Sequence, residues 1–187
     1  MMIYTYNYNS ILGTILLASD GNALTGLWLE GQKYSDDILQ EQQGKQKTLS
    51  VFEKTIQWLD IYFKGKNPDF TPPLSFTYNA SPFRKAVWNI LLTIPYGQTM
   101  TYGEIARQIA KQKAISKMSA QAVGGAVGHN PISIIVPCHR VVGTNGSLTG
   151  YGGGIDKKIK LLELEKVDMQ KFFTPKKSKC PIKENPL

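Results

Sequence analysis

Cysteine and histidine are scarce in this chain of 187 residues, which contains two of each. A fold held together by disulfides needs several cysteine pairs, so this class is excluded and a reducing, cytoplasmic compartment is favoured. A structural zinc site needs four ligands, and one of the two cysteines, Cys180, lies in a lysine-rich C-terminal stretch. We therefore expect no metal and no other cofactor.

Long apolar runs are missing as well. No segment approaches the roughly 18 consecutive apolar residues that a membrane-spanning helix needs. The N-terminus, MMIYTYNYNS, lacks the basic block and the apolar block of a secretory signal. Hydrophobic residues make up 42% and charged residues 19% of the chain, which is typical of a globular protein with one ordinary domain or two small ones. We expect no contact with a membrane.

Acidic residues are rare in the middle of the chain. Residues 81–160 contain two acidic and ten basic side chains, a balance of +8, whereas residues 1–80 have a balance of −2. Positive charge concentrated in one part is typical of proteins that meet a polyanion, with nucleic acid as the first candidate. A solvated basic surface without a partner is the alternative.

The first 75 residues predict a small sheet with one helix. The tyrosines of the N-terminus alternate with polar residues, and ILGTILLAS and ALTGLWLE are two further strands joined at the turn 20–22. Apolar residues at spacings of three and four predict a helix over residues 48–64, which Gly65 ends. The proline-rich stretch that follows is typical of a linker.

The next part, residues 76–168, is predicted to be mainly helical. Ser81 and Pro82 are typical of a helix start, and TYGE, beginning at Thr101, matches a capping box. A second short helix in KMSAQAVGGAVGHNP follows after a polar connection, so the pair indicates a helix-turn-helix.

The fold class that follows is α/β (α+β), with an N-terminal domain over residues 1–75 and a C-terminal DNA-binding domain over residues 76–168. Residues 169–187 are basic and contain prolines, so we expect them to form a mobile tail.

The helix AQAVGGAVG carries one long side chain, Gln121. Each glycine in a helix costs about 1 kcal/mol relative to alanine, so this composition needs a reason. A reader of the major groove needs several long polar side chains, which this helix lacks. The sequence favours a helix that reads the shape of a groove, with the minor groove as the candidate, and tight packing against neighbouring helices is the alternative.

A cysteine and a histidine stand side by side in IIVPCHRVV. We expect residues 134–136 to form a buried strand that presents Cys138, and Asp156 to cap the last helix. A buried structural thiol is the common role of a lone cysteine. However, His139 adjoins it, Glu165 follows in LLELE, and the loop GTNGSLTGYGGG suits a pocket wall, so the pattern also fits a nucleophile with a base and an orienting acid.

The motifs together resemble the O6-alkylguanine-DNA alkyltransferase family. They are PCHRVVG, IPYGQTMTYGEIA upstream, AVGGAVGHNP between them, and GSLTGYGGG and LLELE downstream. The likeness is dense over residues 81–166 and loose before them. It implies a monomeric repair protein that flips O6-alkylguanine, and more weakly O4-alkylthymine, out of double-stranded DNA. The alkyl group is then transferred irreversibly to the protein's own cysteine, once per molecule.

The resemblance also implies a role for individual residues. Cys138 matches the alkyl acceptor, His139 the base that acts through water, Glu165 its support, and Asn130 the hinge between the helix-turn-helix and the active-site loop. The substrate pocket is matched by Tyr102, Val136, Tyr151 and Gly152, the last of these usually a serine in the family. DNA contacts are expected from Gln121, Ala122, Gly124, Ala126 and Arg140, although a local structural role is the alternative for Arg140.

One position departs from the family pattern. The family has an arginine before AVG, where it fills the space of the flipped base, and this chain has Gln121, which brings no charge. We expect weaker DNA binding and less stable flipping as a result. Two other classes stay open: a non-catalytic protein that binds the lesion, which would lack Cys138, and a cysteine hydrolase, which would need oxyanion donors.

Overall fold

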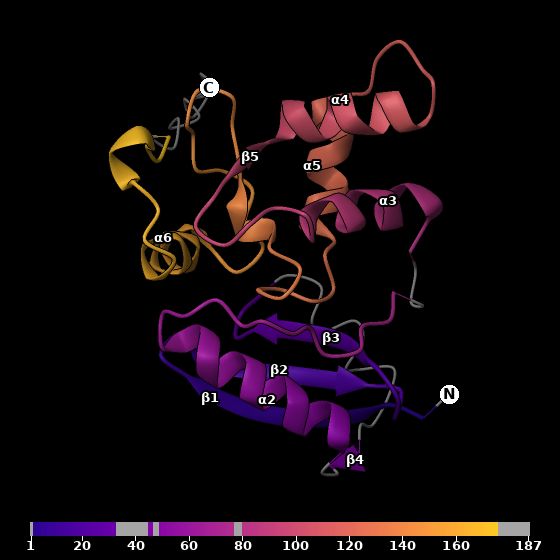
Figure 1. Ribbon diagram of the computed structural model, residues 1–187, viewed down its shortest axis with the longest axis vertical. Coiled ribbons are helices and arrows are strands. Elements are labelled where there is room, and N and C mark those ends of the chain that lie inside the picture. Colours follow the sequence, from indigo (N-terminus) through magenta and orange to yellow (C-terminus); the bar gives the residue numbers. More distant parts are fainter. Residues whose placement is uncertain (1, 33–44, 47–48, 77–79, 176–187) are drawn as a thin grey trace, which may run out of the picture.

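The structure is a computed structural model that describes residues 2–32, 45–46, 49–76 and 80–175. A sheet with one helix forms the lower part of the molecule in Figure 1, and the remaining helices form the upper part. The predicted fold class is confirmed. None of the helices within these ranges has the length and apolar character needed to cross a membrane.

Three strands of the N-terminal part form an antiparallel meander: β1 (Tyr4–Ser10), β2 (Gly13–Ser19) and β3 (Leu24–Leu29). A two-residue strand, β4 (Lys45–Gln46), pairs parallel to β1, so the strand order is β3-β2-β1-β4. The predicted turn between β2 and β3 is present, with Asp20 N donating to the Ala23 carbonyl at 3.3 Å.

The helix α2 (Ser50–Phe63) covers one face of this sheet (Figure 1). Its buried side chains include Phe52, Leu59 and Tyr62, which join the core formed by the inward residues of β2 and β3. The chain leaves the helix through Gly65, whose φ of +71° lies in the left-handed region that glycine adopts without strain.

The C-terminal part contains α3 (Pro82–Leu91), α4 (Tyr102–Gln112), α5 (Ala120–Gly128) and α6 (Ile155–Leu164). Short parallel strands, β5 (Met100–Thr101) and β6 (Val141–Val142), and two 3-10 turns, η1 (Cys138–Arg140) and η2 (Met169–Lys171), connect them. The N-caps Ser81 and Thr101 and the capping box of α4 are confirmed. The neighbours α4 and α5 form the predicted helix-turn-helix (Figure 1).

Two local predictions are wrong. Residues 134–136 form a sequence of turns rather than a strand, and Ile134 has a φ of +69°, which a strand does not allow. Gly154, not Asp156, occupies the N-cap of α6, with a φ of +93° and no side chain as a cap. In both cases the backbone adopts a conformation that hydrophobicity and polarity alone do not reveal.

The edge strand β3 joins the two parts of the chain. Leu27 N donates to the Pro131 carbonyl at 2.9 Å, and Ser133 N donates to the Leu27 carbonyl at 2.9 Å. One hydrophobic core runs from the sheet through these residues to α3, α4 and α5. The segment that leads to Cys138 is therefore attached to the N-terminal sheet.

The segment expected to be a tail begins as ordered structure. Asp168 caps η2, and Leu148 N donates to the Phe173 carbonyl at 2.8 Å. Met169 and Phe172 pack on the small cluster of Val142, Leu148 and Leu162. The ordered C-terminal part thus extends beyond the expected boundary at residue 168. Residues 176–187, including Cys180, lie outside the described residues.

Candidate active site around Cys138

The Cys138 side chain is buried at the start of η1, with 6% of its surface exposed. Asn130 Nδ2 donates a hydrogen bond to its Sγ at 3.1 Å. Burial raises the pKa of the thiol, whereas the hydrogen bond from Asn130, the charge on Lys158 and a hydrogen bond from Ser133 act in the opposite direction. The thiol is the resting form, so a nearby base has to take its proton before Cys138 acts as a nucleophile.

Asn130 ties the end of α5 to the segment that carries the thiol. Its Nδ2 also donates to the carbonyls of Val136 at 2.7 Å and Ile132 at 3.3 Å, and its Oδ1 accepts from Ile132 N at 3.0 Å. The side chain is buried, so these bonds are shielded from water. One amide therefore fixes both the turn before Cys138 and the thiol itself.

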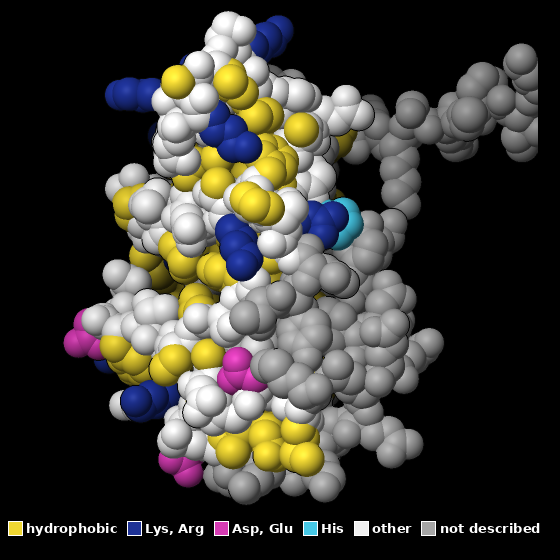
Figure 2. Space-filling model, turned by 90° about the vertical axis from the view of Figure 1, so that its right-hand side faces the viewer, with side chains coloured by type: hydrophobic (Ala, Val, Ile, Leu, Met, Phe, Trp, Pro, Cys, Tyr) yellow, Lys and Arg dark blue, Asp and Glu magenta, His cyan; other side chains and the backbone are white. Residues whose placement is uncertain are grey.

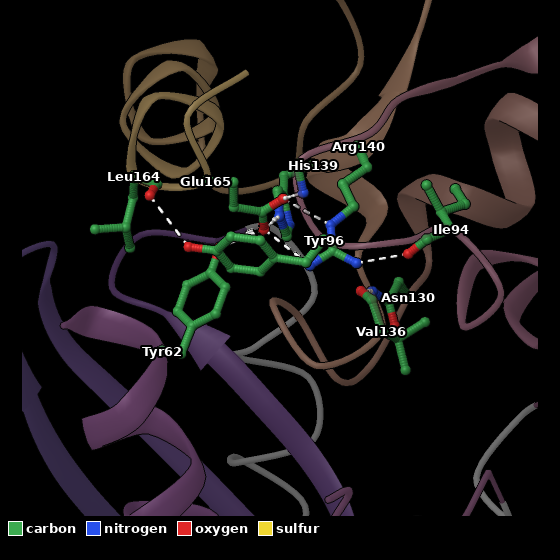
Figure 3. A network of polar contacts seen from close by, with 10 residues as sticks. Tyr62, Ile94, Tyr96, Asn130, Val136, His139, Arg140, Leu164 and Glu165 are labelled. Atoms are coloured by element: carbon green, nitrogen blue, oxygen red, sulfur yellow. Dashed lines mark hydrogen bonds and ion pairs between the residues drawn. The ribbon is translucent and has the colours of Figure 1, made fainter. Parts of the chain in front are cut away.

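The carboxylate of Glu165 is the centre of a buried polar network (Figure 3). Its Oε1 accepts from Tyr62 OH at 2.7 Å, His139 Nε2 at 2.7 Å and Arg140 Nη2 at 2.9 Å. Its Oε2 accepts from Arg140 Nε at 2.8 Å and Gly97 N at 3.0 Å. Burial opposes ionisation of this carboxyl, but His139 and Arg140 outweigh it and hold its pKa below the usual value.

His139 lies fully buried between this carboxylate and the thiol segment. Because Nε2 bonds to Glu165, the hydrogen-bond network assigns the proton of the neutral ring to Nε2. Nδ1 has no hydrogen-bond partner among the described residues. Burial lowers the pKa of His139 and outweighs the opposing effect of Glu165. The ring is thus neutral at pH 7, with Nδ1 able to accept a proton.

A second unpartnered polar atom belongs to Tyr151. Its hydroxyl is buried and has no partner in the described part of the chain, and its ring centroid lies 6.5 Å from that of His139. Buried polar groups without partners cost about 1–3 kcal/mol each. His139 adjoins Cys138 in the sequence and Tyr151 interacts electrostatically with it, so both unpartnered atoms belong to the surroundings of the thiol.

The loop of residues 143–154, which carries Tyr151, is held by Tyr102. Tyr102 OH donates to the Thr149 carbonyl at 3.1 Å. Gly150 has a φ of +71°, and a Cβ there would lie 2.7 Å from the Tyr102 hydroxyl, so the position requires glycine. A Cβ at Gly152 would meet Gln32 Cγ at an ordinary 3.5 Å, so the Cβ of the serine typical of the family would not clash there.

The outer face of α5 carries almost no long side chain. Gln121, Ala122 and Gly125 are exposed, and a Cβ added at Gly125 would meet open space. Gly124 is half-buried, with the Tyr102 ring about van der Waals distance from where its Cβ would be. The predicted small-residue surface is present, and its single long side chain is Gln121.

Two of the expected DNA contacts are wrong. Ala126 faces the core, and its carbonyl accepts from Trp88 Nε1 at 2.9 Å. Arg140 is buried, and its guanidinium is occupied by Glu165 and by the Ile94 carbonyl, which accepts from Nη1 at 2.7 Å. Arg140 therefore balances the buried carboxylate, in agreement with the structural alternative.

Val136, which the resemblance places in the substrate pocket, lies in the segment that Asn130 holds. Its side chain is fully buried, and its carbonyl accepts from Asn130 Nδ2 and from Cys138 N at 2.8 Å. Val136 therefore supports the segment that carries the nucleophile, and its place in the substrate pocket stays a prediction.

Sequence reasoning missed Lys158. This lysine of α6 is fully buried, and its Nζ donates to the carbonyls of Val141 and of Thr149, the latter at 3.0 Å. Burial lowers its pKa to about 8, opposed by the interaction with Cys138. A signal existed in the sequence, because Lys158 and the buried Leu162 share one face of the helix at a spacing of four.

Two residues of the N-terminal part were missed as well. Tyr62 donates to Glu165, and Gln32 Oε1 accepts from Ser133 Oγ at 2.9 Å. All four side chains are buried. The two residues of each pair are about one hundred positions apart, so no local sequence pattern predicts the contact.

Positive charge gathers on the C-terminal part. On the face shown in Figure 2, Lys and Arg side chains lie mainly over the upper part and Asp and Glu over the lower part. The helix-turn-helix contributes four exposed basic residues: Arg107, Lys111, Lys113 and Lys117. In the described part of the chain, no three His, Cys, Asp or Glu side chains gather as metal ligands would.

Comparison with known proteins agrees with this arrangement. The DNA binding domain of the family described as 6-O-methylguanine DNA methyltransferase matches residues 82–167, and its ribonuclease-like domain matches residues 2–76. The chain belongs to this family. The resemblance found in the sequence is thereby confirmed, and the family identifies the chain as a DNA repair methyltransferase that acts on DNA.

Relatives of the family cover most of the chain. The methylated-DNA–protein-cysteine methyltransferase of Mycobacterium leprae is 42% identical over 165 residues, 88% of this chain and 93% of that protein. The protein of the same name from Haemophilus influenzae is 41% identical over 166 residues, which cover 89% of this chain and 87% of that protein.

Solved structures of the family show the same fold. The crystal structure of Mycobacterium tuberculosis O6-methylguanine methyltransferase has a TM-score of 0.73 at 42% identity and covers 88% of this chain and 93% of its own. The crystal structure of Mycobacterium tuberculosis OGT in complex with DNA has a TM-score of 0.72 at 41% identity. The match covers 92% of this chain and 95% of that one.

The position of Lys158 predicts how this methyltransferase responds to loss of a buried cation. In Lys158→Met the thiolate loses a favourable charge, so labelling of Cys138 by iodoacetamide at pH 7 should slow by about threefold or more. Because the pKa of Lys158 is about 8, the difference from the parent should narrow as the pH rises through that value. Mass spectrometry of the Cys138 peptide measures the rate.

Lys160→Met provides the matched control, because Lys160 is exposed on the same helix and carries the same charge. Iodoacetamide should label Cys138 in this control at the same rate as in the parent. Equal labelling rates in Lys158→Met and Lys160→Met at pH 7 would contradict an electrostatic role for Lys158.

Proposed function

We propose that this protein flips O6-alkylguanine, and more weakly O4-alkylthymine, out of double-stranded DNA and transfers the alkyl group irreversibly to Cys138. The observation that carries the proposal is the arrangement of thiol, base and acid. A buried thiol lies next to a buried histidine, whose Nε2 is held by the carboxylate of Glu165 and whose Nδ1 has no partner among the described residues. A structural cysteine needs none of these features.

The proposed step begins with the proton of Cys138 moving to His139 Nδ1 through a water molecule. Glu165 stabilises the imidazolium that forms, while Asn130 and Lys158 stabilise the thiolate. The Sγ attacks the alkyl carbon, so the S–C bond forms as the C–O6 bond breaks. Guanine takes the electron pair of that bond and, as it leaves, gains the proton that His139 returns through water. The product thioether has no good leaving group, which limits each molecule to one turnover.

The base has to leave the duplex, because its O6 substituent is out of reach of a buried thiol inside the stack, and this costs a few kcal/mol. The small-residue face of α5 suits a close approach to the minor groove, while the basic side chains near it suit phosphates. Tyr102 lies between α5 and the loop that carries Tyr151 and Gly152, where it suits contact with the flipped base. A solvated face without a partner would not need a helix so poor in side chains.

Mass spectrometry tests the transfer directly. After incubation with duplex DNA that contains O6-methylguanine, the protein should gain one methyl mass on the Cys138 peptide, at a stoichiometry of one per molecule. Cys138→Ser should gain none. If Cys138 stays unmodified while the DNA is bound, the protein belongs to the class that binds lesions without catalysis. Repeated release of product would instead indicate a hydrolase.

Gln121 allows a test of the flipping step. Gln121→Arg adds a positive charge at an exposed position of α5, so affinity for the duplex and the transfer rate should both rise, by about tenfold or less for one added phosphate or base contact. Gln112→Arg, at the exposed end of α4, is the control for charge alone. A transfer rate in Gln121→Arg that does not exceed that of the control would contradict this account of the position.

A further inference from the structure

Tyr62 brings the N-terminal domain into the active site. It lies in α2, and its hydroxyl is fully buried, donates to Glu165 Oε1 at 2.7 Å and lies 3.4 Å from His139 Nε2 (Figure 3). The carboxylate of Glu165 comes from the other end of the chain, just after α6. This hydrogen bond joins two residues that are 103 positions apart.

Aromatic neighbours fix the position of the Tyr62 ring. The Trp58 ring stacks on it with centroids 5.2 Å apart and an interplanar angle of 12°. The rings of Phe63 and Tyr96 meet it edge-on, at 5.5 Å and 6.1 Å. Since the ring cannot move away, the hydroxyl is held against Glu165. Burial raises the pKa of Tyr62 well above its usual value, followed in importance by the charge on Glu165, so the hydroxyl keeps its proton and stays a donor.

Tyr62 and His139 compete for the same oxygen. Oε1 of Glu165 accepts three hydrogen bonds, from Tyr62, His139 and Arg140, although a carboxylate oxygen has two lone pairs. Each donor draws electron density from that oxygen. The bond from Tyr62 therefore weakens the attraction of Oε1 for the Nε2 proton, and so disfavours the imidazolium.

We propose that Tyr62 is a positioning residue that keeps His139 neutral by sharing Oε1 of Glu165 with it. The proposal rests on the proposed function, since it matters only where His139 accepts the proton of Cys138. It also assigns a chemical task to the N-terminal domain, which has otherwise a structural one. Besides Tyr62, the titratable and charged groups around His139 are Cys138, Arg140, Tyr151, Lys158 and Glu165.

Loss of the Tyr62 hydroxyl should raise the pKa of His139. Removal of the Tyr62 hydroxyl returns electron density to Oε1, which strengthens its pull on the protonated ring. The pKa of His139 then rises, and a larger fraction of the protein carries an imidazolium that cannot accept the thiol proton. At high pH the ring is neutral with or without Tyr62, so transfer should be nearly unchanged there.

The test is the pH profile of single-turnover methyl transfer to Cys138 in Tyr62→Phe, with duplex that contains O6-methylguanine in excess. We expect the acidic limb to move to higher pH, with transfer about three- to tenfold slower on that limb, as half to one unit of pKa implies. The alkaline plateau and the affinity for DNA should stay as in the parent. Phenylalanine preserves the ring and its stacking.

Tyr96→Phe is the matched control. Tyr96 belongs to the same aromatic group, but its hydroxyl donates to the Leu164 carbonyl at 3.1 Å. Loss of the Tyr96 hydroxyl should leave the acidic limb of the pH profile at the same pH as in the parent. Incorporation of 3-fluorotyrosine at position 62 alone keeps the hydroxyl and makes it a stronger donor, so the limb should move in the opposite direction. This second variant retains the test even if Tyr62→Phe does not fold.

The outcomes separate the two proposals. Absence of transfer in the parent at every pH would overturn the proposed function. Transfer in the parent, with the same acidic limb in the fluorotyrosine variant and in folded Tyr62→Phe, would overturn the role of Tyr62 alone. An equal shift in Tyr62→Phe and Tyr96→Phe would also overturn it, because the effect would then come from the aromatic packing.

Discussion

The buried carboxylate of Glu165 is the interaction on which the rest of the site depends. An ionised carboxylate removed from water costs several kcal/mol unless charge and hydrogen bonds replace its hydration. Here five donors do so, and they come from α2, from the loop after α3 and from η1. The folded chain must bring all of these segments together before the carboxylate can be buried, which makes assembly of the site and assembly of the fold one event.

Asn130 performs a similar task for the thiol. The segment before Cys138 is made of turns and contains the left-handed residue Ile134, and backbone bonds such as that from Val136 N to the Ile132 carbonyl at 3.0 Å close those turns. The amide of Asn130 adds hydrogen bonds to Ile132 and Val136 and donates to the thiol itself. The nucleophile is therefore held by the end of α5, the helix proposed to contact DNA. A change in the position of that helix would reach Cys138 through one side chain.

The parts of this site that follow local rules could be predicted from the sequence. The capping box at Thr101 and the ending of α2 at Gly65 depend on residues only a few positions apart, and the motif around Cys138 is compact enough to indicate its family. Arg140 could not be assigned in this way, because its orientation toward Glu165 is decided by a residue 25 positions away. The same applies to Tyr62, whose helical pattern indicates a core residue and not its polar partner.

The step proposed for Cys138 depends on Glu165 fixing the tautomer of His139. The nitrogen chemical shifts of the imidazole measure this directly in protein labelled with ¹⁵N-histidine, and the chain has one other histidine, His129, to distinguish by mutation. At pH 7 we expect a neutral His139 ring with the proton on Nε2 and a bare Nδ1. A proton on Nδ1, alone or together with one on Nε2, would contradict it.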